Sequence, residues 1–237
     1  MISITTLFSR REPPLLGVPL PNRLLAEMIG TALLVIFGPG SAVISAYQDG
    51  AITLEGIAAA NGIIIMVLIY SVGHVSGAHF NPGVTIAFAL FRHFQPREVA
   101  PYIAVQFFGG IIGAGILWAL FGDALKSGVT MPSGSVAQGI GMEIVLTFLL
   151  MFVITAVATD VRAVGAGAAI AIGSAVGLDV LIGGPITGGS MNPARSLGPA
   201  FVSGEMDDLW IYLIAPPIGA ILGAFAYTVV RADHHEP

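Results

Sequence analysis

The chain has no cysteine and a single lysine, Lys126, among its 237 residues. The absence of cysteine excludes a disulfide framework, a thiolate metal site and a cysteine nucleophile. No run of lysine or arginine occurs and the net charge is −5, so the chain has no electrostatic footprint for nucleic acid. We therefore expect no nucleic-acid partner, no bound metal and no other cofactor.

Charged residues are also scarce, at 10% of the chain, against about 25% in an average soluble domain. Hydrophobic residues make up 55%, and the mean hydropathy is +0.89. This balance argues against a soluble enzyme and a disordered protein, and it predicts an integral, multi-pass membrane protein. Three glycine pairs, four residues apart on apolar segments, are predicted helix-packing contacts: Gly109/Gly113, Gly173/Gly177 and Gly219/Gly223.

Six stretches are apolar enough and long enough to cross a hydrocarbon core, which needs about 20 residues. They are too continuously apolar for the alternating strands of a membrane barrel, so the predicted fold class is an all-α membrane protein. The predicted transmembrane helices are Leu24–Tyr47, Gly56–Gly73, Val99–Gly122, Ser135–Thr159, Gly165–Gly183 and Trp210–Arg231.

Positive residues fall unequally on the two sides that six spans create. One side holds Lys126 and Arg195. The other side holds Arg10, Arg11, Arg23, Arg92, Arg97, Arg162 and Arg231. Because cytoplasmic loops carry the excess of arginine and lysine, we expect both termini in the cytoplasm and the protein in the inner (plasma) membrane. Residues 1–23, which prolines interrupt, then form a cytosolic arm rather than a secretory signal, and residues 232–237 form a cytosolic tail.

Two connections, Ser71–Gln95 and Gly183–Asp208, are too apolar and too long for simple loops. Each contains a glycine-rich stretch, then Asn-Pro, then about ten helix-compatible residues, which cover about 15 Å or half a membrane. We interpret both as re-entrant half-helices. Irregular backbone at membrane depth survives only where it is buried in protein or lines a water-filled cavity, so the two connections indicate a pore.

The two halves of the chain repeat each other. Glu27 opens the first span and Glu143 opens the fourth, and the Asn-Pro pairs follow them by 54 and 49 residues. Each half, about 24–122 and 135–231, contains three spans and one re-entrant loop. An odd number of spans inverts the second half in the membrane, so the two loops enter from opposite faces and meet near the midplane.

The pairs Asn81-Pro82 and Asn192-Pro193 are strong helix starts, although a lone pair would more simply be a plain cap. Asn caps through its side-chain oxygen, and Pro suits the first helical position. We therefore expect both side-chain NH₂ groups to be free to donate into the pore. Each half-helix also directs its positive dipole end, about half an elementary charge, at this point. Cations and protons would be repelled there, while a neutral hydroxylated solute would find donors.

The loops SGAHFNPG and TGGSMNPARS, together with Glu27 and Glu143, resemble the aquaporin family, also called the major intrinsic proteins. The resemblance covers residues 24–231. It implies an hourglass of six spans and two half-helices in the lipid bilayer, assembled as a homotetramer with one pore per protomer. It also implies that the two glutamates accept hydrogen bonds from the loop backbones, whereas proton coupling is the alternative role.

The first motif departs from the family pattern. It reads Asn81-Pro82-Gly83, where the family usually has alanine in third place, as Ala194 stands after Asn192-Pro193 in the second motif. We expect Gly83 to remove a methyl group that would pack against the opposite half-helix.

Arg195 directly follows the second motif, and in the resembling family this arginine lies in the narrowest constriction, on the outer side. The family's spacing places the other constriction residues at Asn61, Val180 and Gly189. Water-selective members usually have a bulky aromatic and a histidine at the first two positions. We therefore expect a wider gate, most similar to the nodulin-like, metalloid-permeable branch. Asn61 could instead form a hydrogen bond between helices.

The sequence thus predicts a passive channel for small uncharged solutes such as water, glycerol and arsenous or boric acid, which excludes ions and protons. A water-selective aquaporin is the alternative. A secondary transporter is a more distant one, because inverted repeats and broken helices also occur there. An intramembrane enzyme would have to use His74 and His79, and neither stands beside an acid. We expect no catalytic residue, and we place both histidines in the cytoplasmic vestibule.

Overall fold

The computed structural model describes residues 17–159 and 167–231, and every regular element within these ranges is a helix. Six candidate membrane spans meet the length and hydropathy expected of a crossing. The predicted fold class of an all-α membrane protein is confirmed. The long helices are α1 (Leu20–Phe37), which continues into α2 (Pro39–Tyr47), α3 (Leu54–Ser76), α5 (Pro96–Phe121), α6 (Val136–Thr159), α7 (Ala168–Thr187) and α9 (Leu209–Val230).

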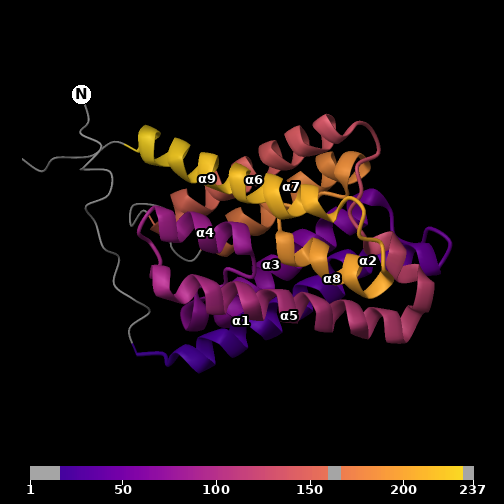
Figure 1. The fold of residues 1–237 in the computed structure, drawn as a ribbon, viewed down its shortest axis with the longest axis horizontal. Coiled ribbons are helices and arrows are strands. Elements are labelled where there is room, and N and C mark those ends of the chain that lie inside the picture. Colours follow the sequence, from indigo (N-terminus) through magenta and orange to yellow (C-terminus); the bar gives the residue numbers. More distant parts are fainter. Residues whose placement is uncertain (1–16, 160–166, 232–237) are drawn as a thin grey trace, which may run out of the picture.

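Two short helices, α4 (Pro82–Leu90) and α8 (Pro193–Ser203), fill the middle of the bundle. Figure 1 shows them entering from opposite ends, between α1 and α5 on one side and α6 and α9 on the other. The start of α1 and the end of α9 lie at the same end of the molecule (Figure 1). The two predicted half-helices are therefore present, and the described chain begins and ends on one side.

The element boundaries differ from the predicted spans in two places. The first span is broken at Gly38, because Pro39 has no backbone N–H to continue the ladder of α1. The third span runs on into a 3₁₀ helix, η2 (Gly122–Gly128). Several positions used in the sequence argument lie outside the described residues: Arg10, Arg11, Arg162, the start of the fifth predicted span, most of the arm and the tail 232–237.

The predicted packing glycines are confirmed at three helix crossings. A Cβ atom placed on Gly113 of α5 would lie 2.5 Å from the carbonyl oxygen of Ala32 in α1. One placed on Gly173 of α7 would lie 2.6 Å from the carbonyl oxygen of Gly62 in α3. Gly219 of α9 makes the equivalent close approach to Ile144 of α6. Each crossing therefore depends on the missing side chain, as in helices that pack by small residues.

The bundle places polar side chains inside and large apolar ones outside. Glu27, Glu143 and Gln106 are completely buried, while Phe108 and Leu120 are 64% and 65% exposed. Such a surface would be costly in water, but it suits hydrocarbon surroundings. Glu27 and Glu143 hydrogen-bond the two re-entrant loops and Gln106 hydrogen-bonds Glu27, so these buried groups belong to the site described next.

Candidate transport pore

Both re-entrant loops follow the same unusual backbone path. Each contains three residues with positive φ, at positions related by a shift of 111 residues. They are Gly77 (89°), Ala78 (51°) and Phe80 (49°) in the first loop, and Gly188 (81°), Gly189 (57°) and Met191 (56°) in the second. Because this region costs a non-glycine residue about 1–2 kcal/mol, the loops need support from outside themselves.

Glu27 supplies that support in the first half. Its carboxylate accepts hydrogen bonds from the backbone N–H groups of His79 at 2.9 Å and Phe80 at 2.7 Å. The hydroxyl of Ser76 donates at 2.7 Å and the amide of Gln106 at 2.8 Å. Four donors on one fully buried carboxylate fix the loop against α1.

Glu143 does the same in the second half. It accepts from the backbone N–H groups of Ser190 at 2.9 Å and Met191 at 2.8 Å, and from the hydroxyl of Thr187 at 2.7 Å. The loop contacts that the family resemblance implies for the two glutamates are thus present in both halves. With their oxygens occupied by loop donors, neither carboxylate faces the solute path.

The two asparagines cap the short helices as their spacing predicts. Asn81 Oδ1 accepts from the N–H of Gly83 at 2.8 Å. Asn192 Oδ1 accepts from the N–H groups of Ala194 at 2.9 Å and Arg195 at 3.3 Å. Prolines 82 and 193 occupy the first turns, where a missing N–H costs nothing.

The expectation that both side-chain NH₂ groups are free is wrong in part. Asn81 Nδ2 donates to the carbonyl oxygen of Met191, and Asn192 Nδ2 donates to the carbonyl oxygen of Phe80, each at 2.8 Å. These reciprocal bonds tie the two loops together at the centre of the bundle. Because an amide NH₂ carries two hydrogens, one N–H of each asparagine is left for a solute.

The interpretation of Gly83 is also corrected. A Cβ atom placed there would lie 3.2 Å from Asn81 Oδ1 and 3.5 Å from the Cα and N atoms of Pro217 in α9. The missing methyl group therefore faces its own cap and α9 rather than the opposite half-helix. The reason is that α4 packs against α9, whereas α8 packs against α5 through Gly198 and Gly110.

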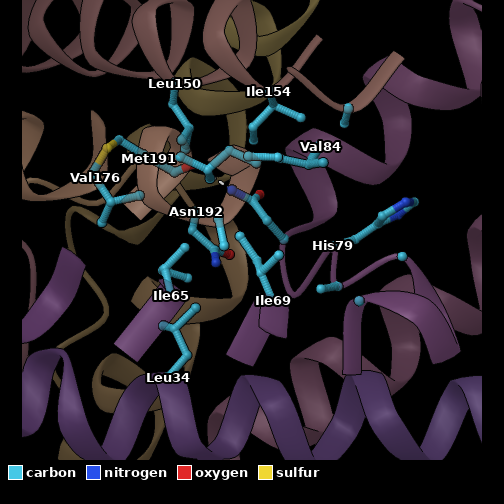
Figure 2. A pocket seen from close by; sticks show the side chains of 18 of the residues that line it. Leu34, Ile65, Ile69, His79, Val84, Leu150, Ile154, Val176, Met191 and Asn192 are labelled. Carbon is cyan, nitrogen blue, oxygen red and sulfur yellow. Dashed lines mark hydrogen bonds between the residues drawn. The ribbon is translucent and has the colours of Figure 1, made fainter. Parts of the chain in front are cut away.

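A cavity of about 490 Å³ runs along both loops. His74 and His79 line one end, both asparagines line the middle, and Asn61, Gly189 and Arg195 line the other end. Figure 2 shows Asn192 between the side chains of Leu34 and Ile65 on one side and Leu150 and Ile154 on the other. The walls are thus mainly apolar, with a sparse row of polar groups.

Several lining and supporting residues were not predicted from the sequence. Ile65 and Ile69 follow Asn61 at intervals of four on α3, so helical spacing alone would have placed them on the same face. Tyr102 and Tyr212 donate to the carbonyl oxygens at the ends of α3 and α7, at 3.0 and 2.8 Å. Aligning the two halves would have revealed this tyrosine pair.

Of the four predicted constriction residues, three line the cavity and the fourth packs behind one of them. Asn61 is 6% exposed, and its Nδ2 donates to the carbonyl oxygen of Ile57 at 2.8 Å. This hydrogen bond lies within α3, whereas the alternative role for Asn61 was a hydrogen bond to another helix. Val180 is not in the cavity wall, where Val176 stands one turn earlier. A Cβ atom placed on Gly189 would lie 3.2 Å from Val180 Cα.

Arg195 is held by two backbone carbonyl groups at the same end of the cavity. Its Nη1 donates to Gly128 at 2.9 Å and its Nη2 to Gly188 at 3.4 Å. The next residue, Ser196, accepts from the hydroxyl of Thr130 at 2.8 Å. Among the residues that the structure describes, no carboxylate bonds to the guanidinium group. Three of its five N–H donors make no hydrogen bond there, and one of these, on Nε, is buried.

The charge and the helix dipoles that face the cavity itself are positive, whereas the carboxylates of Glu27 and Glu143 lie behind the loops and are not part of its wall. The positive ends of α4 and α8 meet at the two asparagines, each worth about half an elementary charge, and Arg195 adds a full charge. The apolar walls offer no replacement for the hydration shell of an ion. Such a path admits neutral molecules that exchange hydrogen bonds with a few donors.

Comparison with known proteins identifies the family. The family model for the major intrinsic proteins matches residues 17–227. Nodulin-26 from Glycine max is 50% identical, over 94% of this chain and 82% of its own length. Aquaporin NIP1-1 from Oryza sativa subsp. japonica is 47% identical, over 91% of this chain and 76% of its own length.

The fold has a solved counterpart. The X-ray structure of the aquaglyceroporin from Plasmodium falciparum superposes with a TM-score of 0.77 at 24% identity, covering 90% of this chain and 97% of that one. The predicted resemblance, including the nodulin-like branch, is confirmed. The chain therefore belongs to the major intrinsic protein family and is a passive membrane channel for small neutral solutes, not an enzyme.

Proposed function

We propose that the channel conducts water, glycerol and compact neutral hydroxy acids such as arsenous and boric acid, and that it excludes ions and protons. The observation that carries this proposal is the lack of bulk at the Arg195 end of the cavity. Gly189 has no side chain there, and the Asn61 amide is folded back onto its own helix at 2.8 Å from the Ile57 carbonyl oxygen. Solutes wider than water then have room beside the guanidinium group.

The residue roles follow from this path. Asn81 and Asn192 each offer one N–H at the centre, while Asn61, Gly189 and Arg195, backed by Val180, select solutes at the narrow end. His74 and His79 line the cytoplasmic vestibule, and Glu27 and Glu143 brace the loops. These groups act by shape, by hydrogen bonding and, for Arg195, by its positive charge, and none has to move a proton or change its covalent state.

Orientation and assembly are part of the proposal. Both termini lie in the cytoplasm of a cell whose plasma (inner) membrane holds the protein. This is supported by Arg23 and Arg231, which stand at the common end of α1 and α9, while Lys126 lies in η2 beyond the far end of α5. Residues 24–231 form the channel domain between a cytosolic arm, 1–23, and a cytosolic tail, 232–237. Four protomers assemble into a homotetramer with one pore each.

A water-selective channel is the competing function, and the width of the pore at its Arg195 end distinguishes the two functions. Replacing Asn61→Phe together with Val180→His adds two rings near the Arg195 end. We expect glycerol and arsenous acid permeability to fall by about tenfold or more, which corresponds to a barrier rise of about 1.4 kcal/mol. Water permeability should fall much less, because single-file water needs less width.

The test is light-scattering stopped-flow on proteoliposomes with the three solutes. The control variant is Asn61→Ala, which removes the amide without adding bulk. If polarity rather than width sets selectivity, Asn61→Ala will be the more harmful change. A wild-type protein that conducts water and excludes both glycerol and arsenous acid would establish the water-selective alternative instead.

A further inference from the structure

The break between α1 and α2 lies directly against the narrow end of the cavity. Gly38 is the one residue between Phe37 and Pro39, the neighbouring ends of α1 and α2. A Cβ atom placed on Gly38 would lie 2.7 Å from Asn61 Oδ1 and 2.7 Å from the carbonyl oxygen of Leu34. Both distances are shorter than real Cβ contacts. The missing side chain therefore leaves a recess, defined here by Gly38, Leu34 and Asn61.

The Asn61 amide fills this recess. Its oxygen lies over Gly38, while its nitrogen donates to the Ile57 carbonyl oxygen at 2.8 Å. These two contacts fix the orientation of the amide plane. The side chain stays 94% buried although Asn61 belongs to the cavity wall. The amide is thus drawn back from the solute path.

We propose that Gly38 is a specificity-determining residue that acts through Asn61: by having no side chain, it holds the Asn61 amide out of the pore and so sets the width of the gate. This inference rests on the proposed function, because it assigns the width of that same gate. Gly38 itself is not in the cavity wall, and it touches the solute path only through its neighbour.

A methyl group at position 38 must displace both groups that it would meet: the Leu34 carbonyl oxygen, by a local shift of the chain at the α1–α2 break, and the Asn61 amide oxygen, by rotation of that side chain. The Asn61 amide must rotate away from the recess, and it then gives up the geometry of its bond to Ile57. Since the recess and the cavity lie on either side of this side chain, the rotation carries the amide toward the solutes. Leu34 borders both the recess, through its carbonyl oxygen, and the cavity.

The neighbouring glycine does not share this role. A Cβ atom placed on Gly40 would meet the side chain of Leu117 at 3.1 Å and the Val35 carbonyl oxygen at 3.5 Å, away from Asn61. Gly115 of α5 provides a matched control, because a Cβ atom placed there has no heavy atom within 4 Å. A Gly→Ala change at 115 adds the same methyl group without touching the gate.

The experiment compares wild type with Gly38→Ala, Asn61→Ala, the double variant and Gly115→Ala in proteoliposomes. Stopped-flow records glycerol and water permeability, and thermal unfolding in detergent records stability. We expect Gly38→Ala to lower glycerol permeability about tenfold and water permeability less than about twofold. The double variant should return to within about twofold of Asn61→Ala, because no amide is then left for the methyl group to push toward the solutes, while the shift at the Leu34 carbonyl oxygen is common to both variants that carry Gly38→Ala. Gly115→Ala should match wild type.

Each other outcome is decisive. A folded Gly38→Ala protein with the glycerol permeability of Gly115→Ala overturns the proposal. If Gly38→Ala does not fold and the double variant does, the recess is filled by Asn61 as proposed; if neither folds, the clash is with the Leu34 backbone and the proposal is wrong. A wild type that excludes glycerol refutes the proposed function instead. In that case the unfolding temperatures still test the contact between Gly38 and Asn61. If the effects of Gly38→Ala and Asn61→Ala on the unfolding temperature are simply additive, the contact is refuted.

Discussion

The carboxylate of Glu143 offers the most direct test of how the second re-entrant loop is held. Its two oxygens accept three hydrogen bonds, from Thr187, Ser190 and Met191, all between 2.7 and 2.9 Å. Glu143→Gln keeps the size of the side chain and replaces one acceptor oxygen by an NH₂ donor. In either orientation of the new amide, the backbone N–H of Ser190 or of Met191 faces a donor.

The expected loss of stability follows from the one backbone N–H group that Glu143→Gln leaves without an acceptor. A buried N–H that loses its acceptor costs about 1–3 kcal/mol. In a protein of this size, 1 kcal/mol shifts the unfolding temperature by about 2–4 °C. The expected loss for Glu143→Gln is therefore about 2–12 °C, together with a fall in glycerol and water flux as the loop around Gly189 loses its support.

The assay is thermal unfolding of purified protein in detergent, followed by circular dichroism, with flux measured in parallel. Glu205→Gln is the matched control, because Glu205 is an exposed partner of Lys126 at 2.8 Å. An exposed pair of this kind contributes about 0–1 kcal/mol. An unfolding temperature of Glu143→Gln equal to that of Glu205→Gln would refute the bracing role.

Two further substitutions test the neighbourhood of the motifs. Mercuric ion should leave the water flux of the cysteine-free wild type unchanged, while the flux of Gly189→Cys should become sensitive to it. This variant should also lose about 1–2 kcal/mol of stability, because position 189 has a φ of 57°. A folded variant that mercuric ion does not inhibit would mean that the constriction lies elsewhere. Gly83→Ala should keep its flux and gain up to about 1 kcal/mol in helix propensity, measured as an unchanged or higher unfolding temperature. The new Cβ meets Pro217 at 3.5 Å, and the Asn81 side chain, whose Oδ1 lies at 3.2 Å, has to shift slightly. A lower unfolding temperature would mean that Asn81 cannot make this shift.

The hydrophobic spans and the Asn-Pro pairs determine most of the fold, and both can be recognised in the sequence. Apolar length predicted six crossings, and the caps at Asn81 and Asn192 predicted where α4 and α8 begin. Both predictions depend on local interactions, because a membrane span must form its backbone hydrogen bonds within its own helix and a cap acts within one helical turn. The inverted repeat then placed the two caps opposite each other.

Contacts between distant segments could not be derived in this way. The reciprocal bonds of Asn81 and Asn192 depend on the exact distance between two loops, which no spacing within either loop encodes. The contact of Gly83 with Pro217 depends on which long helix each half-helix packs against. The proximity of Gly38 and Asn61 joins a helix break to a second helix, and only the assembled bundle shows it.

The central claim is that the path beside Asn81, Asn192 and Arg195 passes neutral solutes and rejects charge. The most direct measurement records glycerol efflux and ionic current from the same purified protein, in vesicles and in planar bilayers. The account predicts rapid glycerol flux with no current above the lipid background in Na⁺, in K⁺ or under a proton gradient. Currents of ordinary channel size carried by any of these cations would contradict it.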